Sequence, residues 1–325
     1  MFAEAIEDIL RDQCIPAAVR AIEAGGSPSV LWESLAGAGF LDLLAPEESG
    51  GASLPLDELF PVLAQFGRYA APVPIAQAIA ARGLVDAGVS LPAGLLTLAP
   101  ALHRHADGRL ACPLVPFGAI ADHVLAADGD QLLLLSCAGA KRQPTAIAHS
   151  QLASLTWSNE AAAKRVAGNA AALSPMAAAV FAALLAGAMT RVFEMTLQYC
   201  NERSQFGKAL GKFQAVQHQL SVMAEQVAAA SIAAEAAFQT PGRSPRLLAA
   251  AIAKGRASEA AAGVANAAHA LHGAIGVTEE YDLQLFTRRL HEWRLAHGAE
   301  GHWHRIVGSL ALDSGTTLAE FVRTA

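Results

Sequence analysis

The chain has 325 residues, of which 53% are hydrophobic, 16% are charged and 6% are aromatic, and its formal net charge is -6. High hydrophobicity with a small net charge excludes intrinsic disorder, and the excess of acidic over basic residues argues against nucleic-acid binding. The cysteines at positions 14, 112, 137 and 200 are too far apart for a CxxC site and too few for a disulfide scaffold. We therefore expect reduced, packed thiols in a cytoplasmic protein.

Helical periodicity dominates the first ninety residues. The spacing of apolar positions predicts helices over 3–13, 28–39 and 56–66, and Ser27-Pro28 is a typical start for the second of these. We expect residues 1–93 to form an N-terminal helical domain.

Short apolar runs replace the helical period between about 94 and 158. Asp128-Gly129 lies between two such runs and indicates a β-hairpin. Four to six short strands are expected, within a reduced β-domain over 94–170.

The remaining residues, 171–325, again favour helix. Long helices are predicted at about 175–202, 210–240, 245–274 and 280–308, and antiparallel helices of this length typically form a four-helix bundle. The predicted fold class is therefore mainly α with a small β-domain: an N-terminal helical domain, a reduced middle β region and a C-terminal four-helix bundle.

One uncharged stretch, from Val166 to Thr190, is long enough to span a bilayer. Ser174-Pro175 inside it is typical of a helix start, with serine as the N-cap, and the remainder is mostly alanine. We interpret this stretch as a core helix that is buried on all sides, and we expect no membrane partner.

Histidines gather near the end of the chain. His297, Glu300 and His304 have the spacing of one helix face, so a metal site there is geometrically possible. His291-Glu292 is not part of an HExxH motif, because Leu295 occupies the position of the second histidine. We favour a polar helix face in contact with solvent or a partner, and no metal is predicted.

Three segments, taken in order, carry a family resemblance. They are LWESLAGAGFLDLLAPEESGG (31–51), YCNERSQFGKALGKFQAVQHQLSVMAE (199–225) and HALHGAIGVTEEYDLQLFTRRL (269–290). Together, around a small β region, they resemble the acyl-CoA dehydrogenase family over nearly the whole chain. The resemblance implies an FAD-dependent α,β-desaturation of an acyl-CoA thioester, in which a carboxylate removes the α-proton and the hydride moves to the flavin. Electron-transferring flavoprotein is the family's usual electron acceptor.

The resemblance also implies a cofactor site that is shared between subunits. Arg203 matches the arginine that pairs with the FAD pyrophosphate, Phe206 the aromatic residue beside it, and Gln214 a polar residue further along. Gly207 would let the backbone approach the cofactor, and Gly273 and Gly276 match a glycine loop that admits a phosphate or ribose. The alternative for Arg203 is an ion pair with Glu202 at the helix end.

The sequence departs from the family at several of these positions. Ala270 stands where glutamine is common, and Gly273-Ala274 replaces a double glycine. The β region reads LLTLAPALHRHADG where the family has a TEPxxGSD-like, flavin-binding segment.

The two family positions of the catalytic glutamate hold other residues, namely His297 and Ala177. His297 itself, or Glu300 one turn beyond it, is a weak candidate for the base.

These departures lead to one hypothesis and two alternatives. The chain is expected to be one subunit of a heteromeric, α2β2 acyl-CoA dehydrogenase, supplying the ADP-side half of the FAD site to a catalytic partner. The favoured substrate is a bulky polycyclic or branched acyl-CoA, as in steroid side-chain degradation. The alternatives are a homotetrameric acyl-CoA dehydrogenase with a displaced base, and a cofactor-free assembly scaffold.

Overall fold

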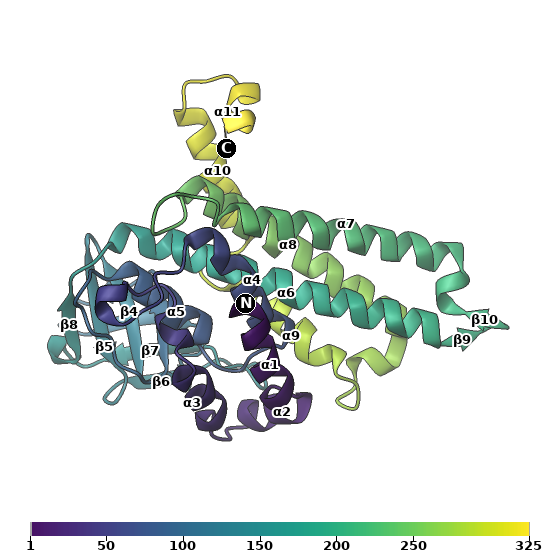
Figure 1. Ribbon diagram of the computed structural model, residues 1–325, viewed down its shortest axis with the longest axis horizontal. Coiled ribbons are helices and arrows are strands. Elements are labelled where there is room, and N and C mark those ends of the chain that lie inside the picture. The colour runs from purple at the N-terminus through teal and green to yellow at the C-terminus, as the bar shows by residue number, and fades with distance from the viewer. Residues whose placement is uncertain (1, 325) are drawn as a thin grey trace.

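The computed structural model describes residues 2–324, and the chain runs through helices, then two small sheets, then a long helical bundle (Figure 1). The N-terminal helices are α1 (Phe2–Gln13), α2 (Pro16–Glu23), α3 (Ser29–Gly37), α4 (Leu59–Arg68) and α5 (Ile75–Leu84). Helices α1, α3 and α4 correspond to the three predicted ones. Helix α5 escaped prediction because all ten of its residues are buried, so it has no amphipathic period.

Eight strands follow among the described residues, in two four-stranded sheets with the orders β1-β4-β5-β8 and β2-β3-β7-β6. Their bounds are β1 (Leu96–Ala99), β2 (His103–Arg104), β3 (Leu110–Val115), β4 (His123–Asp128), β5 (Gln131–Ser136), β6 (Lys141–Pro144), β7 (Ala153–Trp157) and β8 (Ala163–Val166). The expectation of four to six strands was too low, because β6 and β8 read KRQP and AKRV and contain no apolar run. The predicted hairpin is confirmed: Asp128 pairs with Gln131 across a turn in which Gly129 has φ 61°.

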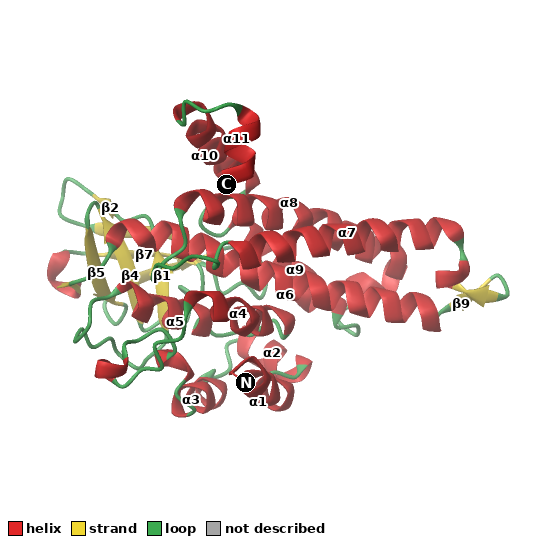
Figure 2. Cartoon of the chain, turned by 45° about the horizontal axis from the view of Figure 1, so that its top comes forward, coloured by secondary structure: helices red, strands yellow, loops and turns green. Residues whose placement is uncertain are grey.

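The two sheets enclose a small core of their own (Figure 2). Trp157 is its largest side chain and is 1% exposed, and the indole Nε1–H donates to the carbonyl oxygen of Ser136 at 2.7 Å. Strand β1 runs parallel to β4, whereas every other pair within the two sheets is antiparallel.

The bundle and its extension contain six helices and a β-hairpin. The helices are α6 (Leu173–Glu202), α7 (Gln214–Ala236), α8 (Leu247–His272), α9 (Leu283–Leu295), α10 (Glu300–Asp313) and α11 (Leu318–Thr324). The first three predicted segments match α6, α7 and α8. The fourth prediction, one helix over 280–308, was wrong: His297 (φ 55°) and Gly298 (φ 107°) have left-handed backbones that end α9. The start of α10 packs against α8, and the rest of α10 with α11 projects away from the bundle (Figure 1).

Helix α6 is the central helix of the molecule. The segment Ala170–Glu202 is long and apolar enough to cross a membrane, but 94% of its most apolar stretch is buried inside the protein, as in the core helix of a soluble protein. The predicted serine cap was wrong by a few residues: the helix already includes Leu173, and Asn169 Oδ1 accepts the Ala172 N–H at 3.2 Å in the preceding turn. Alanine along this helix leaves room for neighbours on every side.

Candidate cofactor site

A cleft of about 560 Å3 lies at one end of the bundle, where α6 ends, α7 begins and α8 ends. It is lined by Tyr199, Arg203, Gln205, Leu210, Val216, Gln219 and residues 270–275. Of the six residues predicted to bind the cofactor, Arg203 and Gly273 line this cleft. Helices α6 and α8 run parallel to each other and antiparallel to α7, so their C-terminal ends meet and bring these two residues together from distant parts of the sequence.

Arg203 directly follows α6 as its C-cap and is held by backbone hydrogen bonds alone. Its N–H donates to the Tyr199 carbonyl at 2.8 Å, and its carbonyl accepts the Leu210 N–H at 2.8 Å. Its side chain is exposed, and over residues 2–324 the guanidinium has no hydrogen-bond or ion-pair partner. Glu202 accepts a hydrogen bond from Gln198 instead, so the alternative ion pair with Glu202 does not form. The guanidinium is free to bind an anion in the cleft.

His272 lines the same cleft and was not singled out from the sequence. Its ring is buried and stacks on Tyr199, with ring centroids 4.4 Å apart. Its Nδ1 lies 2.8 Å from the Ala268 carbonyl, so Nδ1 carries the proton and Nε2 is an acceptor. That Nε2 is buried without a partner, and burial lowers the pKa of the imidazole despite the opposing hydrogen bond. A buried acceptor beside a cleft is suited to a ligand hydroxyl or amine.

The glycine loop after α8 contains two glycines with different roles. Gly273 has φ 65° and ψ -147°, a conformation essentially restricted to glycine, and it lies exposed in the cleft lining. Gly276 is buried, and a Cβ there would lie 2.9 Å from the Cβ of His272. Gly273 thus shapes the cleft wall, whereas Gly276 lets the loop pack closely against His272.

A two-stranded hairpin extends the bundle beside the cleft, formed by β9 (Ser204–Gln205) and β10 (Lys208–Ala209). Phe206 (φ 50°) and Gly207 (φ 82°) are its turn residues, and the Phe206 side chain is 91% exposed. No atom lies within 4 Å of a Cβ built on Gly207, so here glycine satisfies the left-handed turn rather than a close contact within the chain. An exposed phenylalanine at this tip is available to a partner or a ligand.

Gln214 is the first residue of α7 and its side chain is exposed, but it does not line the cleft. Gln219, further along the same helix, does. The sequence motif led to the start of this helix, and only the direction of the helix shows which glutamine faces the cleft.

His297 and Ala177, the two residues expected at the family's base positions, lie on facing elements. The His297 ring meets Phe181 edge-on at 5.1 Å between centroids, and Ala177 is one turn before Phe181 on α6. Ala177 and Phe181 are 0% exposed, so no water-sized space adjoins either side chain. Burial, followed by the charge of Lys254, lowers the pKa of His297 to about 3. His297 is therefore a neutral ring in a filled space.

Glu300, the other candidate base, begins α10 and forms an ion pair with Arg294. Burial would raise the pKa of this carboxyl, but the hydrogen bonds from its own backbone amide and from Arg294 lower the pKa overall. A carboxylate engaged in this way is a weak base.

The stretch expected at the family's flavin-binding segment offers no free hydroxyl: residues 95–99 are buried, and residues 103–108 are exposed but contain no serine or threonine. Thr97 bears the one hydroxyl in LLTLAPALHRHADG, and its side chain is 0% exposed and donates to the Pro116 carbonyl at 2.8 Å. No hydroxyl of this segment is thus available to a flavin.

Across residues 2–324, no three His, Cys, Asp or Glu side chains are grouped as metal ligands.

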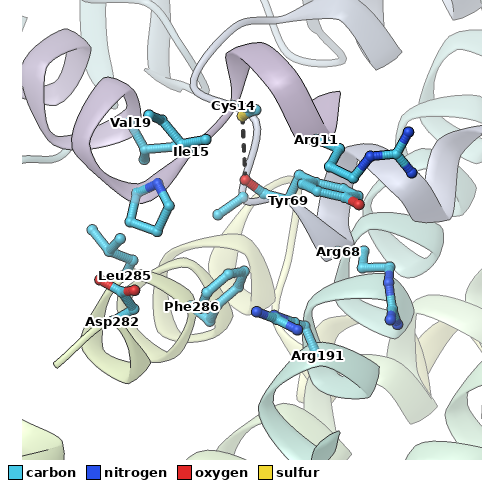
Figure 3. Close-up of a pocket in the computed structure, with 12 residues that line it drawn as sticks. Arg11, Cys14, Ile15, Val19, Arg68, Tyr69, Arg191, Asp282, Leu285 and Phe286 are labelled. Atoms are coloured by element: carbon cyan, nitrogen blue, oxygen red, sulfur yellow. Dashed lines mark hydrogen bonds between the residues drawn. The ribbon is translucent and has the colours of Figure 1, made fainter. Parts of the chain in front are cut away.

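A cavity of about 240 Å3 lies between the N-terminal helices and the bundle, with Phe286 and Leu285 on one side and Arg191 beside them (Figure 3). Its other arginines are engaged in ion pairs, Arg68 with Glu194 among them.

Comparison with known proteins identifies the family. Residues 1–89 match the acyl-CoA dehydrogenase N-terminal domain, and residues 153–309 match the acyl-CoA dehydrogenase C-terminal domain. The chain is 32% identical over 302 residues to acyl-CoA dehydrogenase IpdE2 of Mycolicibacterium smegmatis, covering 90% of this chain and 91% of that one. It is also 32% identical over 300 residues to IpdE2 of Mycobacterium tuberculosis, covering 90% of each.

Solved structures share the fold. The ChsE4-ChsE5 complex from Mycobacterium tuberculosis matches with a TM-score of 0.83 and 23% identity, over 97% of both chains. A steroid acyl-CoA dehydrogenase that pairs Tcur3481 with Tcur3483 matches with a TM-score of 0.79 and 27% identity, over 97% of this chain and 98% of that one. The chain therefore belongs to the acyl-CoA dehydrogenase family.

Proposed function

We propose that this chain is one subunit of a heteromeric, FAD-dependent acyl-CoA dehydrogenase and supplies the ADP-side half of the FAD site to a catalytic partner. The observation that carries the proposal is the contrast between the two halves of the site. The bundle end presents an open cleft with an unpaired guanidinium at Arg203, whereas the space at Ala177 and His297 is filled.

The residues of the cleft fit the ADP side of FAD. The Arg203 guanidinium suits a pyrophosphate, because its planar N–H groups bind phosphate oxygens in pairs. The unpartnered Nε2 of His272 suits a hydroxyl or amino donor, as in a ribose or adenine. Gly273 leaves the cleft wall without a side chain. When bound, the flavin accepts the hydride that the acyl group loses.

We expect the partner to supply the catalytic half of the active site, which contains the base. Removal of the α-proton needs a base beside the thioester, and His297 and Glu300 are respectively enclosed and ion-paired. A second acyl-CoA dehydrogenase-like subunit, in an α2β2 arrangement, would supply the carboxylate and the flavin-ring pocket. The names of the similar structures, a ChsE4-ChsE5 complex and a Tcur3481-Tcur3483 steroid enzyme, support such a pairing.

The substrate, the electron acceptor and the cellular location are further parts of the same proposal. A bulky acyl-CoA of the steroid side-chain type is the favoured substrate, and electron-transferring flavoprotein is the expected acceptor. The protein is expected in the cytoplasm.

The test compares the chain alone with the chain in its complex. Affinity-tagged chain is purified after expression alone and after recovery from its native host, and flavin content is measured from the absorbance near 450 nm. The proposal expects little flavin in the isolated chain, and a flavin-containing complex with a second, homologous subunit that oxidises an acyl-CoA. A homo-oligomer with stoichiometric FAD and acyl-CoA dehydrogenase activity would contradict it. A native complex without flavin would instead support an assembly scaffold.

A further inference from the structure

The turn between α9 and α10 has a backbone that needs support from its surroundings. His297 and Gly298 both have positive φ, 55° and 107°. Histidine rarely adopts this conformation without compensating contacts. A Cβ on Gly298 would lie 2.6 Å from the His302 ring, so the turn is also packed tightly against α10.

Lys254 of α8 provides contacts on both sides of this turn. Its side chain is 0% exposed, and its Nζ donates to the Arg294 carbonyl at 2.9 Å and to the Gly298 carbonyl at 3.1 Å. The third hydrogen bond goes to Ser258 Oγ at 2.7 Å, and Ser258 Oγ in turn donates to the Arg294 carbonyl at 3.1 Å. All three groups accept from Nζ, and three N–H donors are what an ammonium offers.

The charged groups around Lys254 come from each neighbouring element. Arg294 of α9 and Glu300 of α10 form an ion pair that bridges the turn. The turn contributes His297, and His304 of α10 lies over Gly255, where a Cβ would be 2.7 Å from its ring. Burial, together with Arg294 and against the attraction of Glu300, lowers the pKa of Lys254 to about 7.

The turn determines where the His297 ring lies. That ring faces Phe181, which in turn contacts Trp293 at 6.4 Å between centroids. The His297 Nε2 is buried without a partner, so the ring is held by packing and by the backbone of the turn rather than by its own hydrogen bonds.

We propose that Lys254 is a positioning residue, which ties both sides of the α9–α10 turn to α8 and thereby keeps His297 enclosed against Phe181. His297, which is expected to occupy the family's base position in this chain, is therefore closed to water and to a thioester. The inference uses the family's base position but neither the flavin nor the partner. Failure of the role of Lys254 would therefore leave the proposed function standing, whereas an open, titrating His297 in the wild type would count against both.

The experiment follows the protonation of His297 in the full chain. Histidines are labelled with carbon-13, the His297 signal is assigned with His297→Gln, and its chemical shift is followed by NMR from pH 5 to 8. In the wild type the signal stays constant, because an enclosed ring with a pKa of about 3 is neutral throughout. In Lys254→Met the ring reaches water, and the signal titrates with a midpoint above pH 5, a shift of at least two pH units. The exposed Lys164→Met is the matched control and leaves the signal constant.

A second variant separates positioning from charge. Ser258→Ala retains the lysine charge but removes one of its three hydrogen-bond partners, so positioning predicts a smaller effect, in which the His297 signal begins to move at the acid end of the same pH range. Titration of His297 near pH 6.5 in the wild type would overturn the enclosed site. An unchanged signal in Ser258→Ala and in folded Lys254→Met would overturn the role of Lys254. If Lys254→Met does not fold, Ser258→Ala decides alone.

Discussion

Gly67 of α4 and Gly187 of α6 form a reciprocal contact at the crossing of their helices. A Cβ on Gly187 would lie 1.9 Å from the carbonyl oxygen of Ala64, and a Cβ on Gly67 would lie 2.0 Å from that of Leu184. Each glycine therefore faces the backbone of the other helix. This close approach joins the N-terminal helices to the central helix of the bundle.

Gly187→Ala is expected to destabilise the protein. Alanine favours helix over glycine, but the added methyl group has no space unless the two helices move apart, and overpacking of this kind costs about 1–3 kcal/mol. The free energy of unfolding, measured with urea, is expected to fall by about that amount. Gly263→Ala in α8 is the matched control, because no atom lies within 4 Å of the added Cβ. That control is expected to gain about 0.5–1 kcal/mol, and a loss in both variants would contradict the packing argument.

Arg203→Ala is expected to reduce flavin binding by the assembled enzyme. Hydrogen bonds to a charged group contribute about 1.5–3 kcal/mol, so we expect the dissociation constant of FAD to rise about tenfold or more. Flavin content after gel filtration and a fluorescence titration with FAD check this. Arg305→Ala, an exposed arginine on α10, is the control and should retain flavin. Unchanged flavin binding in Arg203→Ala would favour a scaffold.

Glu300→Gln and His297→Gln are expected to leave the turnover number of the assembled enzyme within about twofold, because the partner supplies the base. Acyl-CoA oxidation with an artificial electron acceptor measures this, with each variant assembled into the complex. A fall of a hundredfold or more in one variant would identify a displaced base in this chain.

The stability of the protein is expected to depend on pH through Lys254. Burial lowers the pKa of Lys254 in the folded state from 10.5 to about 7, so between these values the unfolded chain binds more protons than the folded one. The free energy of unfolding therefore rises with pH across this window, by at most about 1.4 kcal/mol per pH unit for one group. Urea unfolding at pH 7, 8 and 9 checks this as the difference between the wild type and Lys254→Met, in which other titrations cancel. A difference that does not change with pH would contradict the lowered pKa.

The four thiols are expected to be unreactive in the folded protein. All four cysteines are free and buried, and burial raises the pKa of Cys14 and Cys112 to about 12 and that of Cys137 to about 11. Because the thiolate is the reactive form, Ellman's reagent at pH 8 should label no thiol until denaturant is added. Labelling of the native protein would show that one of them is accessible.

Turns were predicted correctly where the residue type by itself favours the backbone conformation of the turn. The hairpin at Asp128-Gly129 was predicted from its turn residues, since a left-handed backbone favours glycine. The break at 297–298 was missed, because histidine gives no such signal and Gly298 alone was not read as a helix end. Strands β6 and β8 were missed because edge strands need no apolar run to pair.

The sequence by itself determined the family, the order of helices, sheets and bundle, and the positions where Arg203 and Gly273 stand, because these depend on residue types at fixed spacings. Only the tertiary structure decided that Gln219 rather than Gln214 faces the cleft, that His272 offers a buried acceptor there, and that Lys254 supports the turn of His297. Each of these depends on side chains brought together from different helices. Burial and hydrogen bonding across helices therefore set their chemistry, and one-dimensional spacing does not record such contacts.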